Sequence, residues 1–321
     1  MPLRADSQDV RYAYRLLLGR EPDDAGFSHH MDAVRRGNLS TQNVAQNLMR
    51  SEEYAICNSV DSELQEVELG GVKFFPWRGD RLIGRHLVEA IEYEPNVLPV
   101  FLESIRPGDF VLDVGANIGI FSLFAAQRVG ASGQVLAIEP VMKNVNSLCA
   151  GILENAFKNV AVFPIAASDR VGVIALIRDS DSSNGIVDSH FQPTSRCDYV
   201  PTQRLDFLFA GTKRIDVIKI DIEGHEPVAW SGLKSLVAEH RPLVFTEFAP
   251  VTIRNHSHTD PEQYLDELFE FADSHIDVLH RDIERVRTTS GAEIMREWRA
   301  ANERAGLDGT LHLDLMVDTR K

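Results

Sequence analysis

A short run of acidic and basic side chains, Asp221-Ile-Glu223-Gly-His225-Glu226, follows an apolar segment that begins at Ile215. Carboxylates and an imidazole in one turn can hold a hydroxyl group or take up its proton, because histidine titrates near neutral pH. We assign His225 as the candidate general base, and Asp221 and Glu223 as the other candidate catalytic residues. The structural alternative for His225 is a helix cap or a solvent-facing side chain.

The same turn also suggests a metal site. Asp221, Glu223 and Glu247 offer hard oxygen ligands, which favour Mg²⁺ over zinc. Adjacent acidic residues more often face solvent or support other groups. We therefore assign no metal ligand and leave Mg²⁺ open.

A second motif, Phe110-Val-Leu-Asp-Val-Gly-Ala-Asn-Ile-Gly119, carries an apolar strand into a glycine turn and then a helix. Small residues let the backbone approach a ligand, and the helix start offers free N–H groups. The spacing differs from the GxGxxG of dinucleotide sites and from the GK[ST] of P-loops. Asp113 would repel a pyrophosphate but suits a ligand with an ammonium group, such as S-adenosylmethionine.

Glu139 stands twenty residues after Gly119, at the end of the next apolar segment. An acidic residue at that distance takes the ribose hydroxyls of an adenosine. The alternative is a solvated glutamate before Pro140. Strand, glycine turn and acid in this order favour the ligand interpretation.

From residue 97 onward, apolar segments alternate with helical patterns, which predicts an α/β domain with helices on both faces of a mainly parallel sheet. A set of seven strands with a late reversal is typical of many methyltransferases. We expect strands at 110–114, 135–139, 160–166, 215–221, 243–248, 276–280 and 311–317. We expect helices at 118–129, 141–156 and 227–239, one opening at 261, and one at 291–304.

The N-terminal part has a different pattern. Residues 7–58 show three short helical stretches, the third capped by Ser40, and a hairpin fits residues 67–75. We therefore divide the chain into a helical module (1–58), a linker with a short hairpin (59–96) and a Rossmann-like domain (97–321). The loop 179–185, flanked by Arg178 and containing Asn184, is a candidate lid or a plain surface loop.

The charge balance argues against nucleic acid as a partner. The chain carries 48 acidic and 33 basic residues, a formal net charge of −15. Phosphate-binding surfaces and anionic membranes need clustered basic residues. The 3 cysteines are far apart, and no segment resembles a signal peptide or a membrane span. These features predict a cytoplasmic protein with reduced thiols.

Several motifs between residues 90 and 250 resemble the FkbM family of methyltransferases. The matching segments are Tyr93-Glu94-Pro95, residues 111–119, Ile138-Glu139-Pro140, Ala166-Ala167-Ser168-Asp169, Arg204-Leu205-Asp206, residues 218–226 and Glu247. The resemblance implies a Rossmann-like fold and O-methylation of a hydroxyl on a sugar, glycan or natural product, with S-adenosylmethionine as cofactor. It implies cofactor contacts at Glu94, Asp113, Gly115, Ala116, Asn117, Gly119, Glu139, Ala167, Ser168, Asp169 and Asp221.

The N-terminal stretch separately resembles the DUF4214 type of helical module, which is often appended to surface-glycan enzymes. The matching segments are residues 14–23, Gly26, residues 37–40 and residues 51–54. We expect this module to mediate homo-oligomer formation or docking. Two other functions stay open: an NAD-dependent oxidoreductase, and a cofactor-binding scaffold without turnover.

Overall fold

The computed structural model describes residues 5–18, 22–36, 40–49, 51, 64–78, 80, 87, 93–177 and 197–320. The chain divides into two compact units. The first comprises residues 1–64, 77–79 and 194–196, and the second comprises residues 65–76, 80–193 and 197–321. Arg178 and the candidate lid at 179–185 lie outside the described residues. Among the described helices, none is long and apolar enough to cross a bilayer.

The first unit contains the three expected helices. They are α1 (Ser7–Leu18), α2 (Asp24–Arg35) and α3 (Thr41–Met49). Their core is made of buried apolar side chains at helical spacing, namely Val10, Tyr14, Val34, Val44 and Leu48. The predicted cap of α3 is confirmed, because the Ser40 hydroxyl accepts a hydrogen bond from the Asn43 amide at 3.2 Å.

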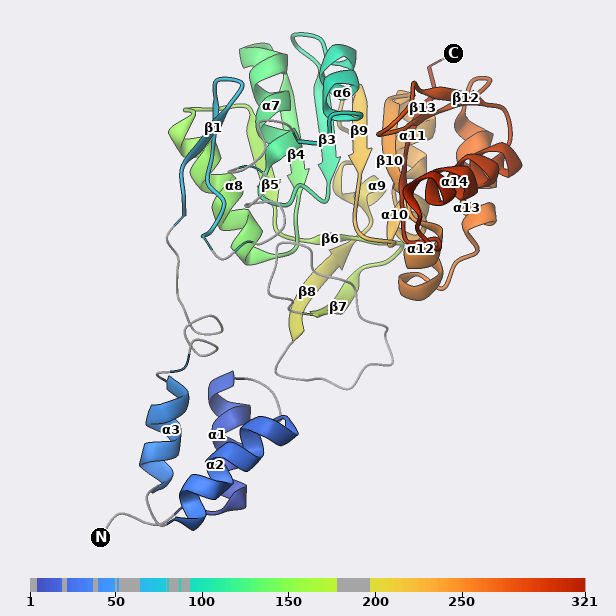
Figure 1. Cartoon of the computed structure of the whole chain (residues 1–321). Helices are drawn as coiled ribbons and strands as arrows, with labels where there is room; N and C mark the ends of the chain where they lie inside the picture. Colours follow the sequence, from blue (N-terminus) through green and yellow to red (C-terminus); the bar gives the residue numbers. More distant parts are fainter. Residues whose placement is uncertain are drawn as a thin grey trace. The chain divides into compact units, whose positions relative to one another are not determined.

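The second unit is built on a twisted mixed sheet with the order β12-β11-β13-β10-β9-β3-β4-β5 (Figure 1). Its strands are β3 (Phe110–Val114), β4 (Gln134–Ile138), β5 (Val160–Phe163), β9 (Val217–Ile220), β10 (Leu243–Phe248), β11 (Ile276–Leu279), β12 (Val286–Thr288) and β13 (Leu313–Asp318). The five strands from β5 to β10 are parallel, and β13 is antiparallel to both of its neighbours. The α/β fold and the late reversal are confirmed, and the short edge strand β12 is an addition.

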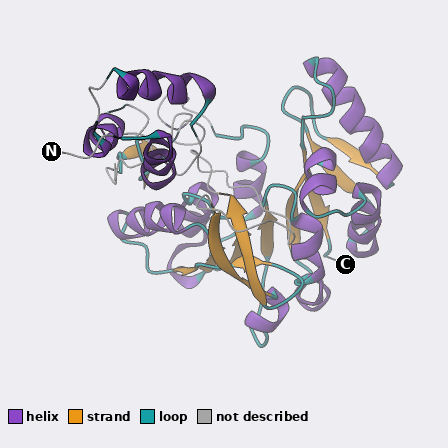
Figure 2. Cartoon of the chain, turned by 90° about the horizontal axis from the view of Figure 1, so that it is seen from below, coloured by secondary structure: helices purple, strands orange, loops and turns teal. Residues whose placement is uncertain are grey.

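Helices lie on both sides of this sheet (Figure 2), and the residues of its central parallel strands are almost all buried, as expected. Adjacent residues of β3 show the alternation: Val111 packs into one apolar cluster and Leu112 into the other. The first cluster lies under α6 (Leu98–Ser104) and α7 (Ile120–Val129), beside α8 (Met142–Glu154). The second lies under α9 (Leu205–Leu208), α10 (Glu226–Ser231), α11 (Lys234–His240), α12 (Pro250–His256), α13 (Pro261–Phe271) and α14 (Gly291–Ala305).

Two smaller sheets complete the unit. The predicted hairpin is present as β1 (Val67–Leu69) and β2 (Val72–Phe74). The other sheet joins β6 (Ala166–Ala167), β8 (Cys197–Gln203) and β7 (Gly172–Ile177) in the order β6-β8-β7. The parallel strands of the large sheet point toward the side on which this three-stranded sheet lies (Figure 1). The predicted strand at 160–166 was therefore too long, because the chain leaves the large sheet after Phe163 and pairs with β8 instead.

The predicted helix at 227–239 is also wrong, because the chain forms two helices separated at Gly232. A Cβ on Gly232 would lie 1.9 Å from the Ser168 carbonyl oxygen. The Gly232 carbonyl also accepts a hydrogen bond from the Asp206 amide at 2.9 Å. The break lets the chain pack closely on the segment that follows β6.

This packing predicts that Gly232→Ala destabilises the protein. The added methyl group must displace backbone rather than a flexible side chain, and overpacking of this kind costs about 1–3 kcal/mol or more. Gly172→Ala is the matched control, because a Cβ there meets only the Thr202 hydroxyl at 3.4 Å. Urea unfolding of both variants is the measurement. Equal stabilities would contradict the close contact.

Candidate active site

A cavity of about 220 Å³ lies at the carboxyl ends of the parallel strands. This is the edge at which open α/β sheets bind their ligands. Its walls come from the segments after β3, β4, β5 and β9, from the ends of β9 and β10 and from the region where β13 begins, together with residues 93–94. Because β13 runs in the opposite direction, its first residues lie at the same edge as the last residues of its neighbours.

The glycine turn after β3 forms the centre of this edge. Gly115 has φ +89°, and a Cβ on it would lie 1.9 Å from the Asp221 carbonyl oxygen. The backbones that follow β3 and β9 therefore touch, and no larger residue fits there. Asn117 also has a positive φ of +51°, and its amide oxygen accepts a hydrogen bond from the Ile118 amide at 2.8 Å.

Glu139 closes one side of the cavity and holds the glycine turn. Its carboxylate accepts hydrogen bonds from the Asn117 and Val141 amides, both at 2.8 Å, and from the Asn144 side chain at 3.4 Å. Burial raises the pKa of Glu139 to about 7, against the effect of these donors. Three of about four acceptor positions of a carboxylate are thus in use, which leaves one for a ligand hydroxyl.

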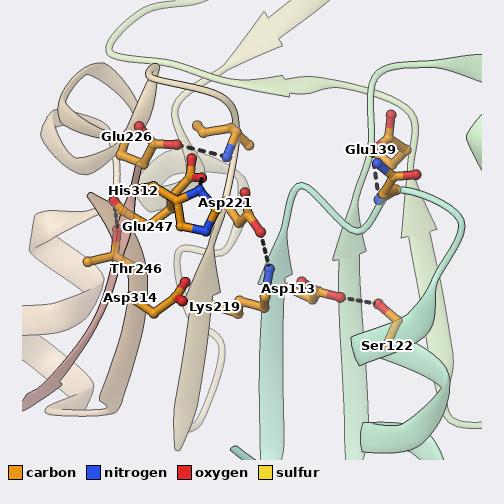
Figure 3. A network of polar contacts seen from close by, with 12 residues as sticks. Asp113, Ser122, Glu139, Lys219, Asp221, Glu226, Thr246, Glu247, His312 and Asp314 are labelled. Carbon is orange, nitrogen blue, oxygen red and sulfur yellow. Dashed lines mark hydrogen bonds and ion pairs between the residues drawn. The ribbon is translucent and has the colours of Figure 1, made fainter. Parts of the chain in front are cut away.

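A buried ammonium group lies in the middle of the site (Figure 3). Lys219 donates to the Asp221 carboxylate at 2.8 Å and lies 4.3 Å from the centre of the Phe121 ring. The carboxylates of Asp221, Glu94 and Asp113 raise its pKa, against the opposing effect of burial. Lys219 thus balances acidic side chains that come from three parts of the chain.

The opposite side of the cavity is acidic. Asp221, Glu247 and Asp314 line it together with His312 (Figure 3). His312 Nδ1 lies 3.1 Å from Glu247 Oε1. Burial raises the pKa of the Glu247 carboxyl well above its usual value, and the Asp221 carboxylate raises it further. Burial likewise raises the pKa of Asp314.

Glu226 shapes the turn between β9 and α10. One of its carboxyl oxygens accepts hydrogen bonds from the Ile222 amide at 2.9 Å and from the Gly224 amide at 3.2 Å. Its other oxygen is buried and has no hydrogen-bond partner among the residues that the structure describes. Burial raises the pKa of Glu226 to about 8. The side chain therefore acts as a structural clamp inside the turn.

The His225 imidazole lines the cavity, and both of its ring nitrogens are buried. Among the described residues, no carboxylate orients the ring and no group forms a hydrogen bond with either nitrogen. Burial lowers the pKa of His225 to about 4, while nearby Asp169 acts in the opposite direction. The imidazole is therefore neutral at physiological pH, and its charged neighbours Asp169 and Arg170 belong to the segment that follows β6. Its assignment as general base stays a prediction.

The structure brings most of the predicted site residues to one cavity. Those that line it are Glu94, Gly115, Ala116, Asn117, Glu139, Ala167, Asp221, Glu223 and His225. Asp113, Gly119, Ser168 and Asp169 are not among the lining residues. Asp113 accepts a hydrogen bond from the Ser122 hydroxyl at 2.6 Å, and a Cβ on Gly119 would meet Leu148 at 2.4 Å.

The lining residues that were missed as site residues include Lys219, His312 and Asp314. The signal for Lys219 was a lone lysine inside an otherwise apolar strand. The signal for the other two was the predicted reversal of the last strand, which brings its start to the ligand edge. For the open question of Mg²⁺, the described part of the chain contains no group of three potential ligand side chains arranged to hold a metal.

Comparisons with known proteins point to one family. A profile described as "Methyltransferase FkbM domain" matches residues 113–282, more than half of the chain. A second profile, a domain of unknown function called DUF4214, matches residues 4–57. Both resemblances inferred from the sequence motifs are thereby confirmed.

Individual relatives are distant. The chain is 54% identical over 35 residues to the ribosomal RNA large subunit methyltransferase E of Sorangium cellulosum and 36% identical over 58 residues to that of Wigglesworthia glossinidia brevipalpis. These matches span 11% and 18% of the chain, and only 16% and 29% of the two relatives. A crystal structure of the methyltransferase FkbM from Methylobacillus flagellatus aligns with 95% of this chain and 58% of its own, at 14% identity and a TM-score of 0.43.

The raised pKa of Glu226 predicts a specific pH dependence of stability. The folded chain holds this proton up to about pH 8, whereas the usual pKa of a glutamate is 4.5. Stability is therefore lost as the pH rises between these values, at up to about 1.4 kcal/mol per pH unit for one proton. Glu226→Gln should remove this contribution and flatten the curve.

The measurement is the free energy of urea unfolding from pH 5 to pH 8. Glu94 and Glu139, each with a pKa of about 7, give both proteins a similar background slope. The difference between wild type and variant therefore reports Glu226. Glu239→Gln, at an exposed carboxylate, is the control and should keep the wild-type slope. Parallel curves for wild type and Glu226→Gln would refute the assignment.

Proposed function

The chain belongs to the FkbM methyltransferase family, and we propose that this S-adenosylmethionine-dependent enzyme methylates a hydroxyl group of a sugar or glycan. The observation that carries the proposal is the division of one cavity into two chemically different ends. The end at β4 suits an adenosine. The end at β10 and β13 offers carboxylates and an imidazole, which are groups that accept hydrogen bonds from hydroxyls.

The residues of the first end fit the cofactor. Glu139 has one acceptor position left for a ribose hydroxyl, and Ile165, Ala166, Ala167 and Leu176 provide an apolar wall for an adenine. Glu94 and Asp221 offer carboxylates near the glycine turn, where an ammonium group would be stabilised. The cofactor supplies an activated methyl group on sulfur. The protein's contribution is then mainly to position the acceptor in line with it.

The second end favours a neutral acceptor. Asp221, Glu247 and Asp314 surround it, so a phosphate or carboxylate on the acceptor would be repelled. The ribosomal RNA named for the two partial relatives is not carried over to this chain, because a net charge of −15 opposes binding to a phosphate backbone. A polyhydroxylated sugar meets the carboxylates with hydrogen-bond donors.

The test is methyl transfer by the full-length protein from isotopically labelled S-adenosylmethionine to glycan extracts. The product is analysed by mass spectrometry and linkage analysis. We expect the acceptor to gain the mass of one methylene, in an ether that resists alkaline hydrolysis. Label in an alkali-labile ester, on nitrogen or in RNA would contradict hydroxyl methylation of a glycan.

The position of Glu139 predicts its effect on cofactor affinity. Glu139→Ala should weaken binding of S-adenosylhomocysteine about 10–150-fold, because a hydrogen bond to a charged group is worth about 1.5–3 kcal/mol. Calorimetry measures the affinity, and thermal unfolding without ligand checks that the glycine turn still folds. Glu154→Ala, at an exposed residue in α8, is the matched control. An unchanged affinity in a folded Glu139→Ala protein would remove the ribose contact from this account.

A further inference from the structure

The start of β13 brings a histidine and a glutamate together at the acidic end of the cavity. Asp314 pairs in register with Glu247 of β10, and His312 stands two residues before Asp314. His312 Nδ1 lies 3.1 Å from Glu247 Oε1, and His312 Nε2 lies 2.8 Å from a guanidinium nitrogen of Arg281. The imidazole is thus held on both sides (Figure 3 shows the glutamate side).

These contacts determine which ring nitrogen carries the proton. A guanidinium group only donates hydrogen bonds, so His312 Nε2 must accept from Arg281. The proton of the neutral imidazole then sits on Nδ1, which lies 3.1 Å from Glu247 Oε1. This arrangement leaves the Nε2 lone pair as the basic site, and Arg281 occupies the place of a hydrogen-bond donor.

The exposure of the Glu247, His312 and Arg281 side chains suits a proton-accepting pair made of His312 and Glu247. The Glu247 side chain is 10% exposed, whereas that of His312 is 29% exposed and lines the cavity. Arg281 is at the surface and can leave Nε2 when another donor arrives. The other acidic groups that act on Glu247 are Asp221, Glu226, Glu223 and Asp314. A buried carboxyl group that orients a more accessible imidazole is an arrangement suited to general-base catalysis.

His225, the base expected from the sequence, lacks these features. No carboxylate orients its ring, and its charged neighbours follow β6. Along the sheet edge the order is β13, β10, β9, β3, β4. His312 therefore stands beyond Asp221 on the side away from Glu139, where an acceptor would approach a cofactor bound over β3 and β4.

We propose that His312 is the general base for the acceptor hydroxyl, that Glu247 is its positioning residue, and that Arg281 occupies His312 Nε2 until the acceptor displaces it. The inference rests on the proposed hydroxyl methylation. The acceptor oxygen forms its bond to the methyl carbon while the carbon–sulfur bond breaks with its electron pair going to sulfur. The hydroxyl proton passes to His312 Nε2, and the Nδ1–H of the resulting imidazolium stays beside Glu247 Oε1.

The first test needs no acceptor. Full-length protein labelled with ¹⁵N-histidine is studied by NMR at neutral pH, and the His312 signals are identified by their loss in His312→Gln. We expect the proton on Nδ1 and an unprotonated Nε2. In an Arg281→Ala background, where the guanidinium no longer fixes Nε2, Glu247→Ala should abolish this preference, and Glu247→Gln should keep it, because its amide oxygen still accepts from Nδ1–H. A proton on Nε2 in the wild type, or a spectrum of Arg281→Ala that Glu247→Ala leaves unchanged, would overturn the arrangement.

The second test uses the glycan acceptor found in the methyl-transfer assay. His312→Gln should lower kcat by about 10²–10⁴-fold, the usual contribution of a general base, while its affinity for S-adenosylhomocysteine stays within about 2-fold of the wild type. His275→Gln, at the opposite edge of the sheet, is the control and should keep full activity.

Substitution of Arg281 provides a third test of the proposal. Arg281→Ala should retain or increase kcat, because it frees His312 Nε2, and Arg285→Ala is its matched surface control. A wild-type rate in His312→Gln, or a loss in Arg281→Ala as large as that in His312→Gln, would refute the proposal. Absence of methyl transfer to any hydroxyl by the wild type would instead refute the proposed function, and the NMR result would still decide the placement of the His312 proton.

Discussion

Lys219 of β9 lies among the carboxylates of the site. Its ammonium group allows these carboxylates to be buried together. It is 5% exposed, donates to Asp221 at 2.8 Å, and lies 4.3 Å from the Phe121 ring centre. Asp113 of β3 is 1% exposed and depends on the same positive charge. Removing one partner from such a buried cluster leaves an uncompensated charge, which typically costs about 3–5 kcal/mol. The polar edges of β3 and β9 therefore depend on one side chain.

This cluster also links the two ends of the cavity. On one side, the glycine turn touches the backbone after β9 at Gly115 and is held by Glu139. On the other side, Asp221 adjoins the acidic end formed by β10 and β13. A shift of β9 would thus move both the cofactor half and the acceptor half. The pairing of β13 with β10 adds His312 to the acceptor half, which a purely parallel sheet could not do.

Much of the fold follows from local sequence patterns. Strands 110–114 and 243–248 were predicted at their observed bounds, because buried parallel strands form unbroken apolar runs between turn residues. The helix expected at 227–239 is interrupted at Gly232. A glycine is required there because the backbone touches Ser168, a residue far away in the sequence. The small sheet of β6, β7 and β8 was missed because β6 has two residues and pairs with strands that follow much later in the chain.

Site residues could be predicted where several of them stand close together in the sequence, as in the glycine turn and in residues 221–226. It was not predictable where a side chain acquires its role through pairing across the sheet. His312 is an ordinary histidine in the sequence, and only the antiparallel register of β13 brings it to Glu247. His225, by contrast, stands among carboxylates in the sequence, yet the turn buries its ring away from them.

Hydrogen–deuterium exchange of the full-length protein with and without S-adenosylhomocysteine tests the central claim most directly, namely that the cofactor binds in the cavity at the carboxyl edge. We predict slower amide exchange in residues 114–119, 139–141 and 165–168 at saturating ligand, with no change in the described helices between residues 5 and 49. Protection confined to those N-terminal helices, or bound ligand that leaves exchange of the glycine turn unchanged, would contradict the account.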